Sequence, residues 1–264
     1  MTKFEDIDLE FDESNRIAII YFNRTKQFNA FNIPLVNELI TAFNKISSND
    51  RIRCLVLTGR GKAFSAGGDV VEFKNAEKPD EFMASLVERL HQGIRDLKNM
   101  NIPSVAAING ACFGAGLGYA IACDFRISSE LATFGCAFTK IGLSPDSSST
   151  FHLPRLVGLG LANEMLFLNR VLNAEEALQF NLVNKLINSG NFLEEVKNFA
   201  IEVSKGAPIA FSSTKNLLKD SYSNDLDTHL DQEAEKIVKA AGTDDFQEGL
   251  KAFFEKRDPD FCGE

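Results

Sequence analysis

The sequence predicts an α/β protein with a central sheet of parallel strands. Apolar residues recur at helical spacing over 33–46 and over 82–97, which indicates two amphipathic helices. Three short runs rich in β-branched and apolar residues, with polar or glycine-containing flanks, are typical of buried strands; they are 17–22, 52–57 and 104–108. Strands that alternate with helices favour parallel pairing, because parallel neighbours need a crossover connection.

The last third of the chain differs, because helix follows helix from about residue 191. Apolar spacing predicts helices over 192–203, from Pro208 onward, over 226–238 and over 246–254, with Thr243 and Asp244 as candidate caps of the last one. No Gly/Ser-rich linker precedes this region. We therefore predict a core over 1–195 and a C-terminal helical region over 196–264 that packs on the core or on another subunit.

Composition indicates a globular protein. The 264 residues are 44% hydrophobic, which is enough for a substantial core without disulfide staples. The five cysteines form an odd set with no CxxC pair, so we expect reduced, mostly buried thiols. The N-terminus is acidic and polar, and no window has the roughly 20 apolar residues that a membrane span needs. We expect a cytoplasmic protein with no membrane partner.

Charge and histidine content restrict the ligands. A net charge of -9 argues against a nucleic-acid partner, although a local basic patch could still bind a phosphorylated ligand. Only three histidines occur, without a spaced ligand set, so we expect no metal. Of these, His152 and His229 are interpreted as structural or surface residues.

Two glycine-rich segments follow predicted strands, at 59–69 and at 109–118. Small side chains at such places let a ligand approach the backbone, and the free amides of a following helix can then face a developing negative charge. The same glycines would also suit tight turns and close helix packing. Composition alone leaves both interpretations open.

Four ordered segments resemble the crotonase (enoyl-CoA hydratase/isomerase) superfamily over nearly the whole chain. They are Asn23-Arg24 with Asn29-Ala30, the stretch KAFSAGGD at 62–69, the stretch PSVAAING at 103–110 with Gly114-Ala115-Gly116 and Cys123-Asp124, and the C-terminal segment 243–256. The resemblance implies a spiral of ββα units with a C-terminal helical region, and an enzyme that stabilises the enolate of an acyl-CoA.

The same resemblance implies roles for individual residues. The amides of Ala66 and Ala115 would form the oxyanion hole, and the coenzyme A chain would pass Gly67, Gly68, Asp69 and Val70. Coenzyme A would belong to the substrate, with no separate cofactor. Lys26 and Phe28, with Phe253 and Lys256 of a neighbouring subunit, would contact the nucleotide. The family also implies a homotrimer or a dimer of trimers.

The acid/base residues differ from those of the hydratases. By alignment, their two catalytic glutamates fall at Gly118 and Phe138, and neither residue can transfer a proton. Asp146 instead occupies the position of the single acidic residue in the Δ3,Δ2-enoyl-CoA and epoxyphenylacetyl-CoA isomerases. One carboxylate suits a reaction that removes a proton from C2 and returns it to C4. The resemblance therefore favours movement of a double bond over hydration.

Several alternatives remain open. Asp146 follows a proline and precedes serines, which is also good turn chemistry, and Phe138 could line the acyl pocket or belong to the core. His91 and Asp146 match positions used by 4-chlorobenzoyl-CoA dehalogenases, which would make Asp146 a nucleophile. The chain has no tryptophan, unlike that subfamily. His91 could otherwise be a helix-surface residue or a second polar group near the pocket. A non-catalytic acyl-CoA-binding or RNA-binding member is the remaining alternative.

Overall fold

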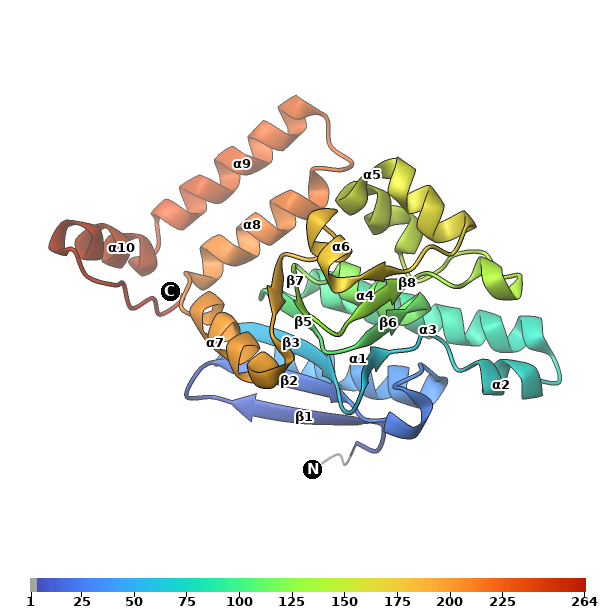
Figure 1. The fold of residues 1–264 in the computed structure, drawn as a ribbon. Coiled ribbons are helices and arrows are strands. Elements are labelled where there is room, and N and C mark those ends of the chain that lie inside the picture. Colours follow the sequence, from blue (N-terminus) through green and yellow to red (C-terminus); the bar gives the residue numbers. More distant parts are fainter. Residues whose placement is uncertain (1–3) are drawn as a thin grey trace.

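A computed structural model describes residues 4–264, which form two sheets with helices around them (Figure 1). The larger sheet has the order β1-β2-β3-β5-β7-β10, and the smaller has the order β4-β6-β8-β9. Only the β1–β2 and β8–β9 pairs are antiparallel among the named strands. The larger sheet comprises β1 (Ile7–Asp12), β2 (Ile17–Phe22), β3 (Cys54–Gly59), β5 (Ser104–Ile108), β7 (Phe125–Ser129) and β10 (Lys185–Ile187). The smaller comprises β4 (Ala63–Ser65), β6 (Ala111–Phe113), β8 (Thr133–Gly135) and β9 (Leu172–Asn173).

A ββα unit recurs three times along the chain. In each unit the first strand joins the larger sheet, the second joins the smaller sheet, and helices follow. The units are β3-β4 with α2 (Val70–Asn75) and α3 (Pro79–Asn99), β5-β6 with α4 (Gly114–Ala122), and β7-β8 with α5 (Ser149–Phe167). This arrangement confirms the predicted spiral. Because β4, β6 and β8 are neighbours in the smaller sheet, the loops that follow them lie next to one another.

The larger sheet is buried on both faces, and β2 shows why. Its side chains alternate, so that Ala18, Ile20 and Phe22 enter one apolar cluster while Ile17 and Ile19 enter another. The first cluster also contains α1 (Ile33–Ser47), α3 and α4, and the second contains α7 (Phe192–Ser204). A sheet covered on both faces explains why its strands read as continuous apolar runs.

The C-terminal helices leave the core as an arm (Figure 1). It consists of α8 (Pro208–Asp220), α9 (Leu226–Ala241) and α10 (Asp244–Glu255). The boundary predicted between residues 195 and 196 is wrong in one respect: it falls inside α7, which packs on the larger sheet through Val196 and Ala200. The arm therefore begins after Ser204.

Most sequence-predicted elements are confirmed. The strand at 104–108 has the predicted bounds, and Thr243 caps α10 by accepting a hydrogen bond from the Phe246 N–H. Four of the five cysteines are buried and all five are free, while Cys262 is exposed. The short β4, β6 and β8 were not predicted, because three residues are too few for a periodic signal. The remaining elements are α6 (Ala174–Gln179) and three 3-10 turns at Thr25–Gln27, Thr139–Ile141 and Ser189–Asn191.

Over residues 4–264, no helix combines the length and the apolar character needed to cross a lipid bilayer.

Candidate active site

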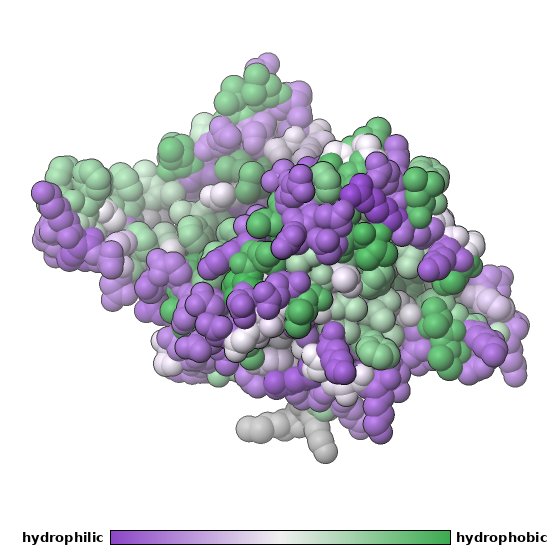
Figure 2. Space-filling view, in the orientation of Figure 1, coloured by the Kyte–Doolittle hydropathy of each residue, from purple (hydrophilic) through white to green (hydrophobic). Residues whose placement is uncertain are grey.

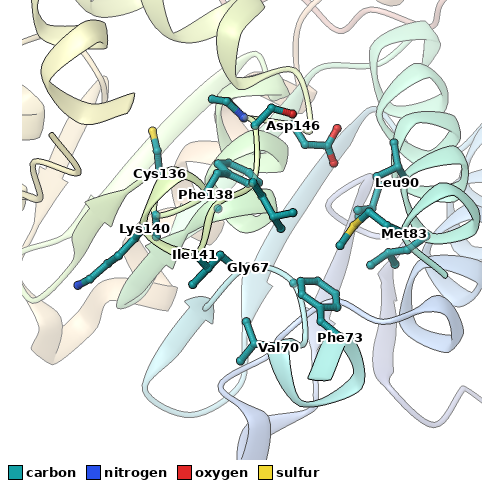
Figure 3. Close-up of a pocket in the computed structure, with 18 of the residues that line it drawn as sticks. Gly67, Val70, Phe73, Met83, Leu90, Cys136, Phe138, Lys140, Ile141 and Asp146 are labelled. Atoms are coloured by element: carbon teal, nitrogen blue, oxygen red, sulfur yellow. The ribbon is translucent and has the colours of Figure 1, made fainter. Parts of the chain in front are cut away.

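A cavity of about 320 Å³ lies where the loops after β4 and β8 meet α3 (Figure 3). Most of its lining is apolar and comes from α2, α3 and the segment 136–145. These side chains are Val70, Phe73, Met83, Leu86, Val87, Leu90, Cys136, Phe138, Ile141 and Leu143. Asp146 is the one acidic residue that the described chain contributes to this lining, and in Figure 3 its carboxylate projects into the cavity near Leu90. Lys140 is the one cationic residue that the described chain adds to the lining, and a mostly apolar cavity with few charged groups is typical of a site for a small organic group.

The loop after β4 presents its backbone to this cavity, but the amide of Ala66 does not fit its predicted role. The Ala66 N–H donates to the Phe28 carbonyl at 2.9 Å, so the prediction that Ala66 supplies an oxyanion donor is wrong. Phe31 pairs with Gly68 in a parallel β-bridge. The Phe31 carbonyl accepts a hydrogen bond from the Asp69 N–H, and the Phe31 N–H donates to the Gly67 carbonyl. In such a bridge the N–H of the central residue points away from the partner.

The N–H of Gly68 therefore points away from Phe31, and Gly68 is one of the residues that line the cavity. Within residues 4–264 we find no acceptor for this N–H. The amide that the loop offers to a ligand is thus that of Gly68, two residues after the predicted one.

Asp69 has a structural task in place of a ligand contact. Its side chain caps α2 by accepting from the Val71 and Glu72 N–H groups, and it lies 3.0 Å from a guanidinium nitrogen of Arg24. The side chains of Asp69 and Arg24 are 8% and 11% exposed. This buried ion pair connects the Asn-Arg signature with the glycine-rich loop and fixes the path of residues 66–69.

The second glycine-rich segment places Ala115 in the first turn of α4. Amide N–H groups in a first turn have no acceptor within their own helix. Gly114 adopts φ 51°, and a Cβ there would lie 3.4 Å from the Cα of Gly67, so the two glycine-rich segments touch. The Ala115 amide and the Gly68 amide therefore belong to adjoining backbone segments, since β4 pairs with β6 just before them.

Asp146 is held by one hydrogen bond on each carboxylate oxygen. Nε2 of His91 lies 2.6 Å from Oδ1, and the Ser147 hydroxyl donates to Oδ2 at 3.2 Å. The Asp146 side chain is 21% exposed. His91 follows Leu90 on α3, so the helix that forms the apolar wall also positions the carboxylate. The structure thus brings together Asp146, His91, Phe138 and the glycine-rich loops.

The loop that carries Asp146 packs against α4 at a glycine. Ser147 and Ser148 both adopt left-handed backbone conformations, with φ 53° and 63°, which cost energy outside glycine. A Cβ on Gly118 would lie 2.2 Å from the Ser147 carbonyl oxygen and 2.6 Å from its Cβ. Neither atom belongs to a flexible side-chain end. A side chain at 118 is therefore incompatible with this path of the Asp146 loop.

Other predicted contacts lie at the periphery. Phe138 lines the cavity, and its ring edge lies 3.9 Å from the position of a Gly114 Cβ. Val70 lies at the cavity and is 56% exposed, and Lys26 and Phe28 are exposed beside the loop that Phe28 anchors. Phe253 and Lys256 are exposed on the distant α10, outside the cavity of the same chain.

This arrangement can stabilise an enolate. It offers the amides of Gly68 and Ala115 on adjoining backbone segments, and the carboxylate of Asp146 in a mostly apolar cavity. Such fixed donors act strongly where water is excluded, because they require no reorganisation as charge develops.

Comparison with known proteins agrees with this geometry. The profile of the enoyl-CoA hydratase/isomerase family matches residues 12–264. The chain belongs to this family, the crotonase superfamily, as its fold also indicates.

Individual relatives carry different activities. The chain is 35% identical to a crotonyl-CoA hydratase of Syntrophomonas wolfei, covering 98% of both chains. It is 30% identical to a trans-2-decenoyl-[acyl-carrier-protein] isomerase of Streptococcus mutans, covering 97% of this chain and 98% of that one. It is 31% identical to a 4-chlorobenzoyl coenzyme A dehalogenase of Arthrobacter, covering 97% and 94%. The crystal structure of an enoyl-CoA hydratase from Bacillus anthracis superimposes with a TM-score of 0.93 at 31% identity, covering 98% and 100%.

We predict that Asp69→Ala lowers stability by about 2 kcal/mol, because it removes a helix cap and the nearest of the three carboxylates around the Arg24 guanidinium, with Asp6 at 3.6 Å and Glu72 at 3.9 Å remaining. Urea unfolding followed by circular dichroism measures this change. The control is Asp258→Ala, an exposed acid whose removal should change the unfolding free energy by about 0.5 kcal/mol or less. Equal effects of the two substitutions would contradict a structural role for the Arg24–Asp69 pair.

Proposed function

We propose that this protein is an isomerase that moves a double bond within an unsaturated acyl-CoA. The observation that carries the proposal is that one carboxylate, Asp146, faces the cavity, while the position of the first hydratase glutamate is a glycine without room for a side chain. The relatives support the wider class of acyl-thioester chemistry, and their names include both hydratases and an isomerase.

The proposed reaction uses one base and two amides. Asp146 takes a proton from C2 of a 3-enoyl thioester, and the C–H electron pair moves into the thioester carbonyl to give a dienolate. The N–H groups of Gly68 and Ala115 stabilise the dienolate oxygen. Asp146 then returns its proton to C4, the electrons shift back, and the product is the 2-enoyl thioester. Atoms and charge balance without a further reactant.

Hydration would need more groups than the cavity offers. Addition of water to a 2-enoyl thioester requires a base for the water and an acid at C2. Phe138, at the second hydratase position, has a ring that cannot take part in proton transfer. Among the described cavity residues, Asp146 alone carries a carboxylate.

The test is product identification with a panel of 2-enoyl-, 3-enoyl- and aryl-CoA thioesters. We expect 3-enoyl-CoA to give 2-enoyl-CoA, with little 3-hydroxyacyl-CoA from the 2-enoyl thioesters. Rapid hydration of the 2-enoyl thioesters with no isomerisation would refute the proposal.

We predict that Asp146→Asn lowers kcat by about 10²–10⁴-fold, because the amide cannot accept the C2 proton. Steady-state kinetics measures kcat, and calorimetry with coenzyme A should show unchanged affinity, since the substitution leaves the glycine-rich loops intact. Asp258→Asn serves as the control with normal kcat. Near-normal turnover in Asp146→Asn would remove Asp146 from the reaction.

We predict that Gly118→Ala also lowers kcat, by about 10²-fold, although no reacting group is removed. The new Cβ would displace Ser147 and with it Asp146, and a shift of about 1 Å can have an effect of this size. The matched control is Gly160→Ala in α5, where a Cβ meets nothing within 4 Å. A crystal structure of the Gly118→Ala variant should show the displaced loop; full activity with an unmoved loop would contradict the steric explanation.

The His91–Asp146 pair favours a second candidate, an aspartate-nucleophile hydrolase or dehalogenase. In a dehalogenase a carboxylate oxygen of Asp146 attacks the aryl carbon and expels halide, which leaves an aryl ester; in a thioester hydrolase it attacks the carbonyl carbon and expels the coenzyme A thiolate, which leaves a mixed anhydride. His91 then accepts a proton from the water that cleaves this intermediate. Mass spectrometry of a quenched turnover mixture distinguishes the candidates, because only the second adds the mass of the acyl or aryl group to the peptide containing Asp146.

The arm supports a proposed homotrimer or dimer of trimers. No residue of α9 is buried, and exposed apolar side chains lie over α9 and α10 in Figure 2. These side chains are Leu226, Leu230, Ile237, Val238, Phe246, Leu250, Phe253 and Phe254. Exposed apolar patches of this kind mark protein interfaces. We propose that the arm packs on another copy, where Phe253 and Lys256 could reach that copy's site.

We predict that Ile237→Asp, at a residue that is 70% exposed, shifts the assembly toward monomers. A charge buried in an apolar interface loses hydration without gaining a partner. Light scattering after size exclusion measures the mass. Glu235→Gln, at a polar position of the same helix, should leave the mass unchanged. A monomeric wild type would contradict the proposed assembly.

A further inference from the structure

A second cavity, of about 480 Å³, lies outside the candidate active site, between α3, the start of α5 and α8. Its apolar walls include Ile94, Ile121, Leu156, Phe151 and Tyr222. The volume falls within the range of small-molecule sites. The first cavity ends at Leu90 of α3, and the second begins one turn later at Ile94, so the same helix lines both.

The lining of the second cavity is strongly basic, although the chain carries a net charge of -9. Five cationic residues line it: Arg95, Lys98, Arg126, Lys215 and Lys219. Asp124 is the one acidic residue that the described chain adds. A cavity with this balance, bounded by apolar walls, concentrates a positive potential.

One carboxylate oxygen of Asp124 is already occupied by other donors. Its Oδ2 accepts hydrogen bonds from the Ser104 N–H and hydroxyl at 2.8 Å each, and it lies 2.9 Å from Nζ of Lys215. Nζ of Lys98 lies 3.8 Å from Oδ1, which is beyond hydrogen-bond length. The side chain of Lys98 is only 25% exposed.

The ammonium of Lys98 is therefore partly buried and weakly paired. Burial lowers its pKa, Asp124 opposes that shift, and the neighbouring Lys215 adds to it. The guanidinium of Arg126 does not offer an acceptor to Lys98, and it is itself engaged, since it donates hydrogen bonds to the carbonyls of Leu182 and Cys123. An anion in the cavity would compensate this charge.

His152 adds no positive charge to the cavity at neutral pH. Its pKa is lowered to about 4, mainly by burial and to a smaller extent by the nearby cations Lys98, Arg155 and Arg126. Nδ1 of His152 lies 2.9 Å from the Ser148 hydroxyl, two residues after Asp146. The cavity wall is thus connected to the loop of the candidate active site.

We infer that the second cavity binds the carboxylate of an amphipathic molecule, with the carboxylate at Lys98 and the apolar part against the walls. The carboxylate could belong to a free medium-chain acid or to the distal end of a dicarboxylic acyl thioester. The second source is compatible with the fold, because His91 and Lys98 are seven residues apart on α3, about 10 Å along the helix axis.

The test is calorimetric titration of the full-length protein with octanoate and with its uncharged analogue octanamide. We expect octanoate to bind at least tenfold more tightly, and Lys98→Gln to remove that difference. Lys98→Arg keeps the charge and should retain binding, and Lys74→Gln changes the net charge equally at a distant, exposed position and should have no effect. Asp146→Asn and saturating coenzyme A should leave octanoate binding intact, which separates this cavity from the acyl pocket.

A parallel titration compares suberyl-CoA with octanoyl-CoA. If the carboxylate belongs to the substrate, Lys98→Gln weakens suberyl-CoA at least tenfold and leaves octanoyl-CoA unchanged. The inference is overturned if neither octanoate nor suberyl-CoA depends on Lys98, or if coenzyme A displaces octanoate. Both titrations measure binding, so they give a result even if no isomerase activity is found.

Discussion

The close contact between α4 and the loop of Asp146 at Gly118 is the constraint on which the candidate site depends. A helix position without a side chain lets Ser147 lie against the backbone of α4. Asp146 then emerges next to His91 and enters the cavity. The same contact leaves no room for a side chain at position 118. One glycine thus sets the path of the loop that carries the carboxylate of the candidate site.

The platform itself depends on interactions far apart in the sequence. The Arg24–Asp69 pair and the bridge between Phe31 and Gly68 hold the first glycine-rich loop in place. Asn29 is fully buried and donates to the carbonyls of Arg60 and Ala63, which fixes the same loop from behind. The early Asn-Arg and Asn-Ala signatures therefore shape the site through contacts with its loop.

The sequence predicted the periodic elements and the residues with distinctive chemistry. Long helices such as α3 and buried strands such as β5 have strong periodic patterns, and Asp146 stood out as a carboxylate at a family position. Nothing in the local sequence shows that Gly68 and not Ala66 has the free amide, because this difference depends on the pairing of Gly68 with Phe31. The core likewise extends to the end of α7, because this helix packs on the sheet, which helical periodicity alone does not reveal. Tertiary contacts decided what local patterns left open.

The order of strands in the larger sheet follows the order of the chain from β1 to β10, so each unit mainly adjoins its predecessor and its successor. Gly68, Ala115 and Asp146 come from three consecutive units. The site is therefore complete only after the third unit has docked during folding. A chain that is still attached to the ribosome and ends before residue 146 could bury much of its first two ββα units and still lack the carboxylate of the candidate site.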